Sequence, residues 1–263
     1  MSLRSRLKAL AADWLPPILL RNIRRRREPP GIPPMQAAAM DRFYGSLLRA
    51  NTLCFDVGAN MGHRTASFRR LGARVIAIEP QPCCCLVLRS RFAADPAVTL
   101  VDKGVGGAPG RATMTVSNEH TLSTFSQAFI NATTQSGRFP GAVWNQTLVV
   151  EMVTLDALIV EYGAPDFIKI DVEGFEPEVV RGLSRPIRLT SLEWTPELTD
   201  NVIECVLRLG RLGPIRCNLS WGEGMRLARR EWMEPEALIY TLSQFRDDTH
   251  LFGDVYVRAE DVL

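Results

Sequence analysis

A glycine turn between two short apolar segments is the feature that most constrains the fold of this chain. The first segment ends in Asp56 and runs into Gly58 and Gly62, and the second segment ends in Glu79. Strand, tight turn, helix and second strand, with an acid about 20 residues beyond the turn, form the nucleotide-binding unit of doubly wound α/β proteins. The sequence therefore predicts a mostly parallel sheet with a nucleotide site at the carboxyl ends of these strands.

The spacing of the two glycines indicates which nucleotide binds. Dinucleotide enzymes carry the pattern G-x-G-x-x-G, which brings a helix N-terminus close to a pyrophosphate. Here three residues separate Gly58 from Gly62, and Asp56 stands two residues before the first glycine. A carboxylate at that position would repel a pyrophosphate but attract the ammonium group of S-adenosylmethionine. We therefore predict S-adenosylmethionine as the cofactor, and a nicotinamide-dependent reductase is the less favoured alternative.

A second motif places two more acids at the same edge of the predicted sheet. Residues 167–170 have the pattern of a buried strand, and Asp171 and Glu173 follow it. Ligands of open α/β sheets bind beyond the carboxyl ends of the strands, so we expect both acids to lie beside the cofactor. They are the candidate catalytic residues. In the alternative interpretation, one is solvated and the other caps the next helix or pairs with Lys169.

The rest of the chain is typical of a single α/β domain. Further strands are expected at 74–78, 98–101 and 189–193, a helix at 35–49 and an edge strand at 254–258. With 263 residues, of which 46% are hydrophobic, the chain can bury one large core.

An insertion at residues 111–153 is expected to cover the substrate. It combines short strand-like stretches with a polar loop through Asn131, Ser136, Gly137 and Trp144. Loops held by a rigid scaffold commonly carry recognition. Trp144 offers a flat apolar face for a sugar or another ring, and packing in the protein interior is an equal alternative.

Four motifs together resemble the FkbM family of S-adenosylmethionine-dependent methyltransferases. They are Asp56-Val-Gly-Ala-Asn-Met-Gly62, Glu79-Pro80, Thr154-Leu-Asp-Ala-Leu-Ile159 and Phe167-Ile-Lys-Ile-Asp-Val-Glu-Gly-Phe-Glu176. The resemblance implies a class I methyltransferase fold with a seven-stranded sheet, and usually methylation of a hydroxyl on a sugar, glycolipid or other natural product. It also implies cofactor contacts from residues inside the motifs, namely Asp56, Gly58, Asn60, Gly62, Glu79 and Asp171.

The chemistry we expect is displacement at the sulfonium methyl by an acceptor oxygen. Orientation of the reactants supplies most of the acceleration, and a positioned base adds roughly 10²–10⁴-fold. Asp171 is the first candidate for that base or for orienting the acceptor, and Glu173 is the second. His63 and His120 are weaker candidates, because capping or surface roles explain them as well.

The sequence also permits different functions for the same fold. We assign no metal ion, although Asp171, Glu173 and Glu193 offer carboxylates that could hold Mg²⁺. The chain could instead be a non-catalytic nucleotide-binding module or an N-methyltransferase. The presence of four acids at the expected positions argues against a non-catalytic module.

Charge is distributed unevenly along the chain. Residues 1–28 carry eight arginine and lysine side chains against two acids, so the remainder is mildly acidic. That balance argues against a nucleic-acid substrate. We expect residues 1–34 to be a basic extension with a proline-rich linker and residues 35–263 to be the catalytic domain. The extension is either disordered, packed, or in peripheral contact with an anionic membrane.

The six cysteines do not form a recognisable framework. No Cys-x-x-Cys pair is present, and Cys83, Cys84 and Cys85 are adjacent in a predicted helix, so we expect their side chains to diverge. Reduced thiols in the cytoplasm are the simplest interpretation.

Overall fold

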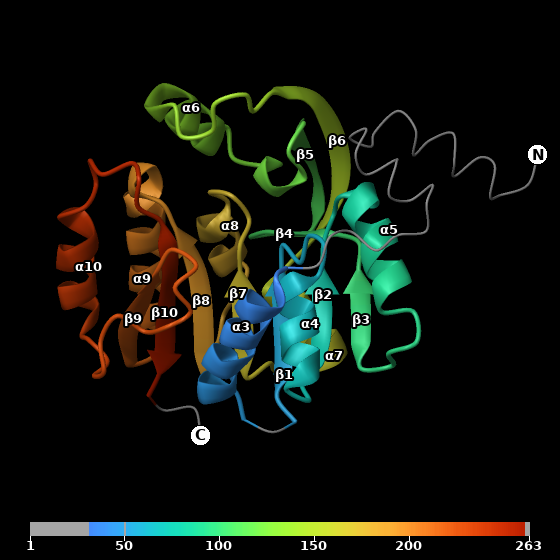
Figure 1. Ribbon diagram of the computed structural model, residues 1–263, viewed down its shortest axis with the longest axis horizontal. Helices are drawn as coiled ribbons and strands as arrows, with labels where there is room; N and C mark the ends of the chain where they lie inside the picture. Colours follow the sequence, from blue (N-terminus) through green and yellow to red (C-terminus); the bar gives the residue numbers. More distant parts are fainter. Residues whose placement is uncertain (1–31, 50, 261–263) are drawn as a thin grey trace, which may run out of the picture.

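A twisted seven-stranded sheet forms the centre of the protein (Figure 1). The computed structural model describes residues 32–49 and 51–260. The strand order is β3-β2-β1-β7-β8-β10-β9, and only β10 runs antiparallel to its neighbours. The strands are β1 (Leu53–Val57), β2 (Arg74–Ile78), β3 (Val98–Val101), β7 (Phe167–Ile170), β8 (Leu189–Trp194), β9 (Ile215–Trp221) and β10 (Gly253–Ala259). The predicted class I methyltransferase fold is confirmed.

Helices cover both faces of the sheet, as the burial of β1 on both sides requires. Phe55 and Val57 belong to an apolar layer that also includes residues of α7 (Leu155–Tyr162), α8 (Glu176–Arg181), α9 (Thr199–Leu212) and α10 (Pro235–Ser243). On the other face, Cys54 packs with α3 (Pro34–Leu47) and α4 (His63–Arg70). The helix α5 (Pro82–Arg91) follows β2. Successive side chains of β1 therefore point to opposite faces of the sheet, into two separate apolar layers.

The glycine turn between β1 and α4 has a left-handed backbone at both of its glycines. Gly58 has φ 82°, and a Cβ atom there would collide with the carbonyl oxygen of Asp171. Gly62, with φ 76°, caps the N-terminus of α4. The two residues therefore fix the turn and allow the β7 loop to pass directly against it.

The insertion forms a small second sheet above the carboxyl ends of the main strands (Figure 1). Its strands are β4 (Gly104–Val105), β5 (Gly110–Ser117) and β6 (Trp144–Val153), and between them lie η1 (His120–Leu122) and α6 (Gln127–Ser136). The prediction of a polar loop is wrong, because Asn131 and Ser136 lie in α6 and Trp144 begins β6. Ser126 accepts a hydrogen bond from the Phe129 N–H at 3.1 Å and caps the helix, which Gly137 ends with φ 69°. We call this insertion the arm.

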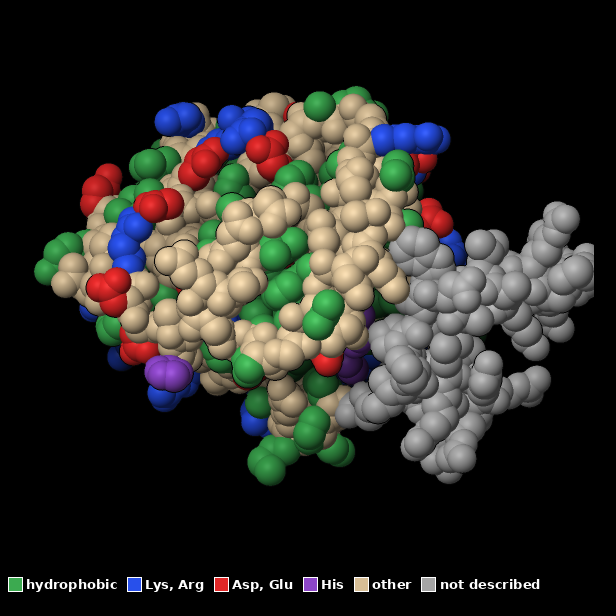
Figure 2. Space-filling model, turned by 90° about the horizontal axis from the view of Figure 1, so that it is seen from above, with side chains coloured by type: hydrophobic (Ala, Val, Ile, Leu, Met, Phe, Trp, Pro, Cys, Tyr) green, Lys and Arg blue, Asp and Glu red, His purple; other side chains and the backbone are tan. Residues whose placement is uncertain are grey.

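The arm gives the molecule a face that is mostly uncharged at its centre. Seen from above, the part of this face drawn in colour shows hydrophobic and neutral side chains in the middle, and charged side chains mostly at the rim (Figure 2). Within residues 32–49 and 51–260, no helix is both long and apolar enough to cross a membrane. The predicted basic segment 1–28 lies outside the described residues, and the domain boundary at residue 35 stays a prediction.

Candidate active site

A cavity of about 490 Å³, counting its opening to solvent, lies between the ends of the central strands and the arm. Its floor includes Gly58, Asn60, Glu79, Asp171 and Glu173, so the structure brings together residues from both predicted motifs. Other lining residues come from the segment after β3 and from the arm, namely Lys103, Gly104, Met114, His120, Thr121, Ser123 and Phe125.

Glu79 is buried at the end of β2 and organises the loops around it. Its carboxylate accepts hydrogen bonds from the N–H groups of Asn60, at 2.9 Å, and Gln81, at 2.8 Å. Burial raises the pKa of Glu79 to about 7, against the lowering effect of these two bonds. A buried acid held in this way at the rim of β2 has the position expected of a ribose-binding residue.

Asp56 and Gly62 lie outside the described lining of the cavity. The Asp56 side chain is 1% exposed and accepts a hydrogen bond from the Thr65 hydroxyl at 2.5 Å. Burial raises the pKa of Asp56, and the Thr65 bond and the Lys169 charge oppose that rise. These contacts tie β1 to the first turn of α4. Cofactor contact by Asp56 and Gly62 stays a prediction.

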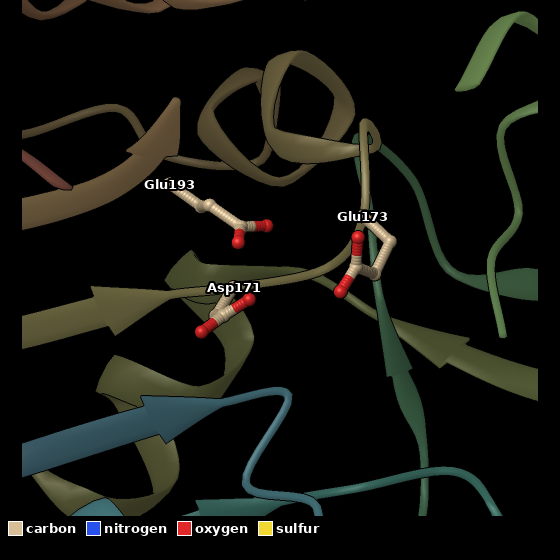
Figure 3. A group of neighbouring side chains, drawn as sticks. All are labelled: Asp171, Glu173 and Glu193. Atoms are coloured by element: carbon tan, nitrogen blue, oxygen red, sulfur yellow. The ribbon is translucent and has the colours of Figure 1, made fainter. Parts of the chain in front are cut away.

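Three carboxylates converge beside the cavity (Figure 3). Asp171 follows β7, Glu173 lies in the next turn, and Glu193 is near the end of β8; oxygen atoms from the three lie within 4.8 Å of one another. We call this group the carboxylate cluster. The geometry also suits a divalent cation, which the sequence leaves open.

A buried lysine supplies positive charge to the carboxylate cluster. Lys169 is 1% exposed, and its Nζ lies 3.2 Å from Asp171 Oδ2 and 2.7 Å from Asp254 Oδ1. Burial alone would raise the pKa of Asp171, but the Lys169 and Arg64 charges outweigh it and lower that pKa. Asp171 is therefore held as a carboxylate. The predicted pairing of Lys169 with one of the two acids is present, and it involves Asp171.

Glu173 has the opposite electrostatic environment. Burial first, and then the nearby charges of Asp171 and Glu176, raise the pKa of Glu173 well above its usual range. Its backbone has φ 55°, a left-handed conformation that is unusual for a residue other than glycine. The Thr124 hydroxyl donates to the Glu173 carbonyl at 2.7 Å, and so the arm fixes this strained residue.

Sequence patterns missed several residues that build the site. Asp254 approaches from β10, far along the chain, and Glu176 ties the turn together by accepting hydrogen bonds from the Val172 and Gly174 N–H groups at 3.1 and 3.3 Å. The Asn60 and Gln81 side chains both donate to the His120 carbonyl, at 3.4 and 2.9 Å. Only the acidic type of Glu176, inside the quoted motif, offered a signal.

Of Trp144 and the two histidines, His120 lines the cavity and the other two lie outside its lining. The Trp144 indole N–H donates to the Leu122 carbonyl at 2.7 Å, and its ring packs edge-on against Phe129. Trp144 therefore takes the packing role of the two alternatives. His63 begins α4 outside the described lining, whereas His120 lines the cavity with a buried Nδ1 that has no hydrogen-bond partner among the described residues.

One family model and several known proteins are similar to this chain. The model of the methyltransferase FkbM domain matches residues 56–210. The methyltransferase sdnD of Sordaria araneosa is 27% identical over 219 residues, which cover 70% of this chain and 83% of that protein. Among solved structures, a putative O-methyltransferase from Klebsiella pneumoniae has a TM-score of 0.45 at 14% identity, covering 97% of this chain and 96% of its own. A precorrin-6y C5,15-methyltransferase from Geobacter metallireducens has a TM-score of 0.44 at 12% identity, covering 85% and 87%.

The family match spans both acidic motifs and more than half of the chain, and the cavity joins those motifs in space. This protein belongs to the FkbM family of methyltransferases, and its cofactor is S-adenosylmethionine.

Proposed function

We propose that the protein methylates a hydroxyl oxygen of an uncharged small molecule, such as a sugar, a glycolipid or another natural product. The observation that carries this proposal is the carboxylate cluster beside the cavity, within which one acid is held ionised and another has a raised pKa. A hydroxyl must lose a proton when it attacks a methyl group, so a base at this position has a use. Apolar side chains, namely those of Met114, Phe125 and Phe175, line part of the cavity, which supports an uncharged acceptor.

The residues of the cavity fit an adenosyl cofactor. Glu79 is a buried acid at the rim of β2, and Gly58 leaves the backbone of the turn free of side-chain bulk. In our proposal Glu79 binds the ribose hydroxyls, whereas Gly58, Asn60 and Asp171 form the wall on the methionine side. S-adenosylmethionine supplies an electrophilic methyl group when it is bound.

Asp171 and Glu173 have separate roles in the proposed reaction. Asp171, fixed by Lys169 at 3.2 Å, accepts a hydrogen bond from a second hydroxyl of the acceptor and so orients the attacking oxygen toward the methyl carbon. Glu173 takes the proton of the attacking hydroxyl. The new carbon–oxygen bond forms as the carbon–sulfur bond breaks, and the sulfur keeps the bonding electron pair. Because its pKa is raised, the Glu173 carboxylate is a stronger base than an ordinary glutamate once it has lost its own proton.

Amine acceptors are the second candidate, because a neutral amine needs no base before attack. A nitrogen acceptor would leave the carboxylate cluster without a use in proton transfer, so we favour oxygen. The predicted membrane contact of residues 1–28 and a cytoplasmic location stay predictions.

The test is methyl transfer from labelled S-adenosylmethionine to matched panels of hydroxyl and amine acceptors. We expect product with a hydroxyl acceptor, at a rate that rises with pH as Glu173 loses its proton. Glu173→Gln should lower turnover by roughly 10²–10⁴-fold while cofactor affinity stays within about twofold of the wild type. Transfer to amines alone, or unchanged turnover in the Glu173 variant, would overturn the assignment. Asp171→Asn serves as the matched variant and should alter acceptor KM as well as turnover.

A further inference from the structure

Three adjacent cysteines open α5, next to the acid that we assign to the cofactor ribose. Because α5 begins at Pro82, Cys83, Cys84 and Cys85 occupy its first turn. The expectation that their side chains diverge is wrong for one pair, because the Sγ atoms of Cys83 and Cys84 lie 3.8 Å apart. Cys83 is half-buried and Cys84 is fully buried. One residue of this contacting pair is therefore partly exposed to solvent.

The surroundings of this pair favour reaction at Cys83. Both thiols lie at the N-terminal end of a ten-residue helix, where the helix dipole stabilises a thiolate. The hydrogen bond between the two thiols lowers the pKa of Cys83, and burial and the Glu79 charge oppose that change. The same bond raises the pKa of Cys84. Cys83 is thus the better nucleophile, and Cys84 is a second thiol already in contact with it.

The first turn of α5 also holds residues 79–81, which connect β2 to this helix. The Cys85 N–H donates to the Gln81 carbonyl at 2.9 Å, and the Cys85 thiol donates to the Glu79 carbonyl at 2.9 Å. Gln81 in turn donates its N–H to the Glu79 carboxylate at 2.8 Å. Any rearrangement of this turn therefore moves the groups that fix Glu79.

We propose that Cys83 and Cys84 form a peroxide-sensitive dithiol whose disulfide form weakens cofactor binding. The Cys83 thiolate attacks an oxygen of hydrogen peroxide, which gives a sulfenic acid and hydroxide. The Cys84 thiol then attacks the sulfenic sulfur, which forms the disulfide and releases water. The two thiols lose two electrons and two protons, and peroxide is reduced to two molecules of water. The effect on the cofactor rests on the proposed role of Glu79.

The disulfide is incompatible with the helical turn, and that is why oxidation acts on binding. Consecutive Cα atoms lie about 3.8 Å apart, below the usual separation of about 4.4–6.8 Å between bridged cysteines. Closing the ring therefore requires the backbone of residues 83–84 to leave the helical conformation, and the bond from the Cys85 N–H to Gln81 is lost. A strained disulfide is easily reduced, so the change is reversible by thiols.

The test uses the full chain, treated with an equimolar amount of hydrogen peroxide. Trypsin cleavage after Arg74 and Arg89 gives a peptide, 75–89, that contains all three cysteines of α5. We expect this peptide to lose two hydrogens, and we expect faster hydrogen exchange at residues 83–86. The affinity for S-adenosylhomocysteine, measured by calorimetry, should fall by about tenfold or more, which corresponds to the loss of one or two hydrogen bonds. Dithiothreitol should restore all three signals.

Two variants separate the switch from general oxidation damage. Cys83→Ser should keep its affinity through the peroxide treatment, whereas Cys205→Ala, which changes a buried cysteine of α9, should still respond. An unbridged peptide, oxygen addition that thiols do not reverse, or a bridged protein with unchanged exchange and affinity would overturn the proposal. If reduced protein does not bind S-adenosylhomocysteine, the role of Glu79 fails, whereas the peptide mass and the exchange rates still decide whether the switch exists.

Discussion

Lys169 and Asp254 form a buried ion pair, with 2.7 Å between Nζ and Oδ1, beneath the carboxylate cluster. The two residues are 85 positions apart in the chain. Because Lys169 also contacts Asp171, this pair links β10 to Asp171, the residue that orients the acceptor in the proposed reaction. The arrangement leads to the first prediction.

Removing the lysine charge should destabilise the protein and disturb Asp171. Lys169→Met leaves Asp254 and Asp171 without their cation, and breaking a buried pair from one side typically costs about 3–5 kcal/mol. The free energy of unfolding in urea measures this loss. The double variant Lys169→Met/Asp254→Asn should recover a large part of it, and equal loss in both variants would contradict the ion-pair interpretation.

Gly58 should tolerate substitution by alanine far less well than its φ value alone implies. Gly58 and Gly72 share φ 82°, but a Cβ at Gly72 meets no atom within 4 Å, whereas one at Gly58 collides with the Asp171 carbonyl. Gly72→Ala should therefore cost only about 1–2 kcal/mol of backbone strain. Gly58→Ala should cost more and abolish binding of S-adenosylhomocysteine. Thermal unfolding and calorimetry on the two variants give the comparison, which fails if they behave alike.

Asp56 can influence the cofactor either directly or through α4. We expect Asp56→Ala to weaken S-adenosylhomocysteine binding and to lower stability by about 1–3 kcal/mol, because the Thr65 hydroxyl loses its acceptor. Thr65→Val removes the same hydrogen bond without touching the carboxylate. A similar loss of affinity in both variants indicates an effect through α4. A loss confined to Asp56→Ala indicates direct contact with the cofactor.

Stability should fall as pH rises from about 4.5 to 7. Burial raises the pKa of both Glu79 and Glu176 from 4.5 to about 7. Groups whose pKa is raised by folding stabilise the fold below their unfolded pKa, and that contribution is lost as pH rises through the folded pKa. The loss is on the order of 3 kcal/mol for each group. Urea unfolding at pH 5 and pH 8 measures it, and Glu176→Gln should reduce the difference by about half.

Chelation should leave methyl transfer unchanged. Lys169 already places a cation against Asp171, so the carboxylate cluster does not need Mg²⁺ to hold that acid in its ionised form. Activity after EDTA treatment and dialysis is the measurement. Loss of activity that Mg²⁺ restores would assign Asp171, Glu173 and Glu193 to a metal site instead.

Local sequence patterns were sufficient to predict which residues the two acidic motifs contribute to the cavity. Gly58, Glu79 and Asp171 each stand directly after a strand, and parallel strands bring their carboxyl ends to one edge, so their proximity follows from the fold class. The pairing of Lys169 with Asp254 did not follow, because it depends on the antiparallel placement of β10. The contact between Cys83 and Cys84 depends on side-chain rotamers, which residue spacing does not determine. The helix α6 was missed because its polar composition hides the Ser126 and Gly137 caps.

The reversed direction of β10 has a consequence for how the protein matures. Because this strand begins at the active-site edge, Asp254 reaches Lys169 only after nearly all of the described chain has been synthesised. Until then, Lys169 can meet only Asp171 of its two ion-pair partners. A ribosome-bound chain ending before residue 253 would therefore carry both cofactor motifs but lack β10, which lies between β8 and β9 in the sheet. We expect the insertion of β10 to be the step that completes the sheet and gives Lys169 its second acidic partner.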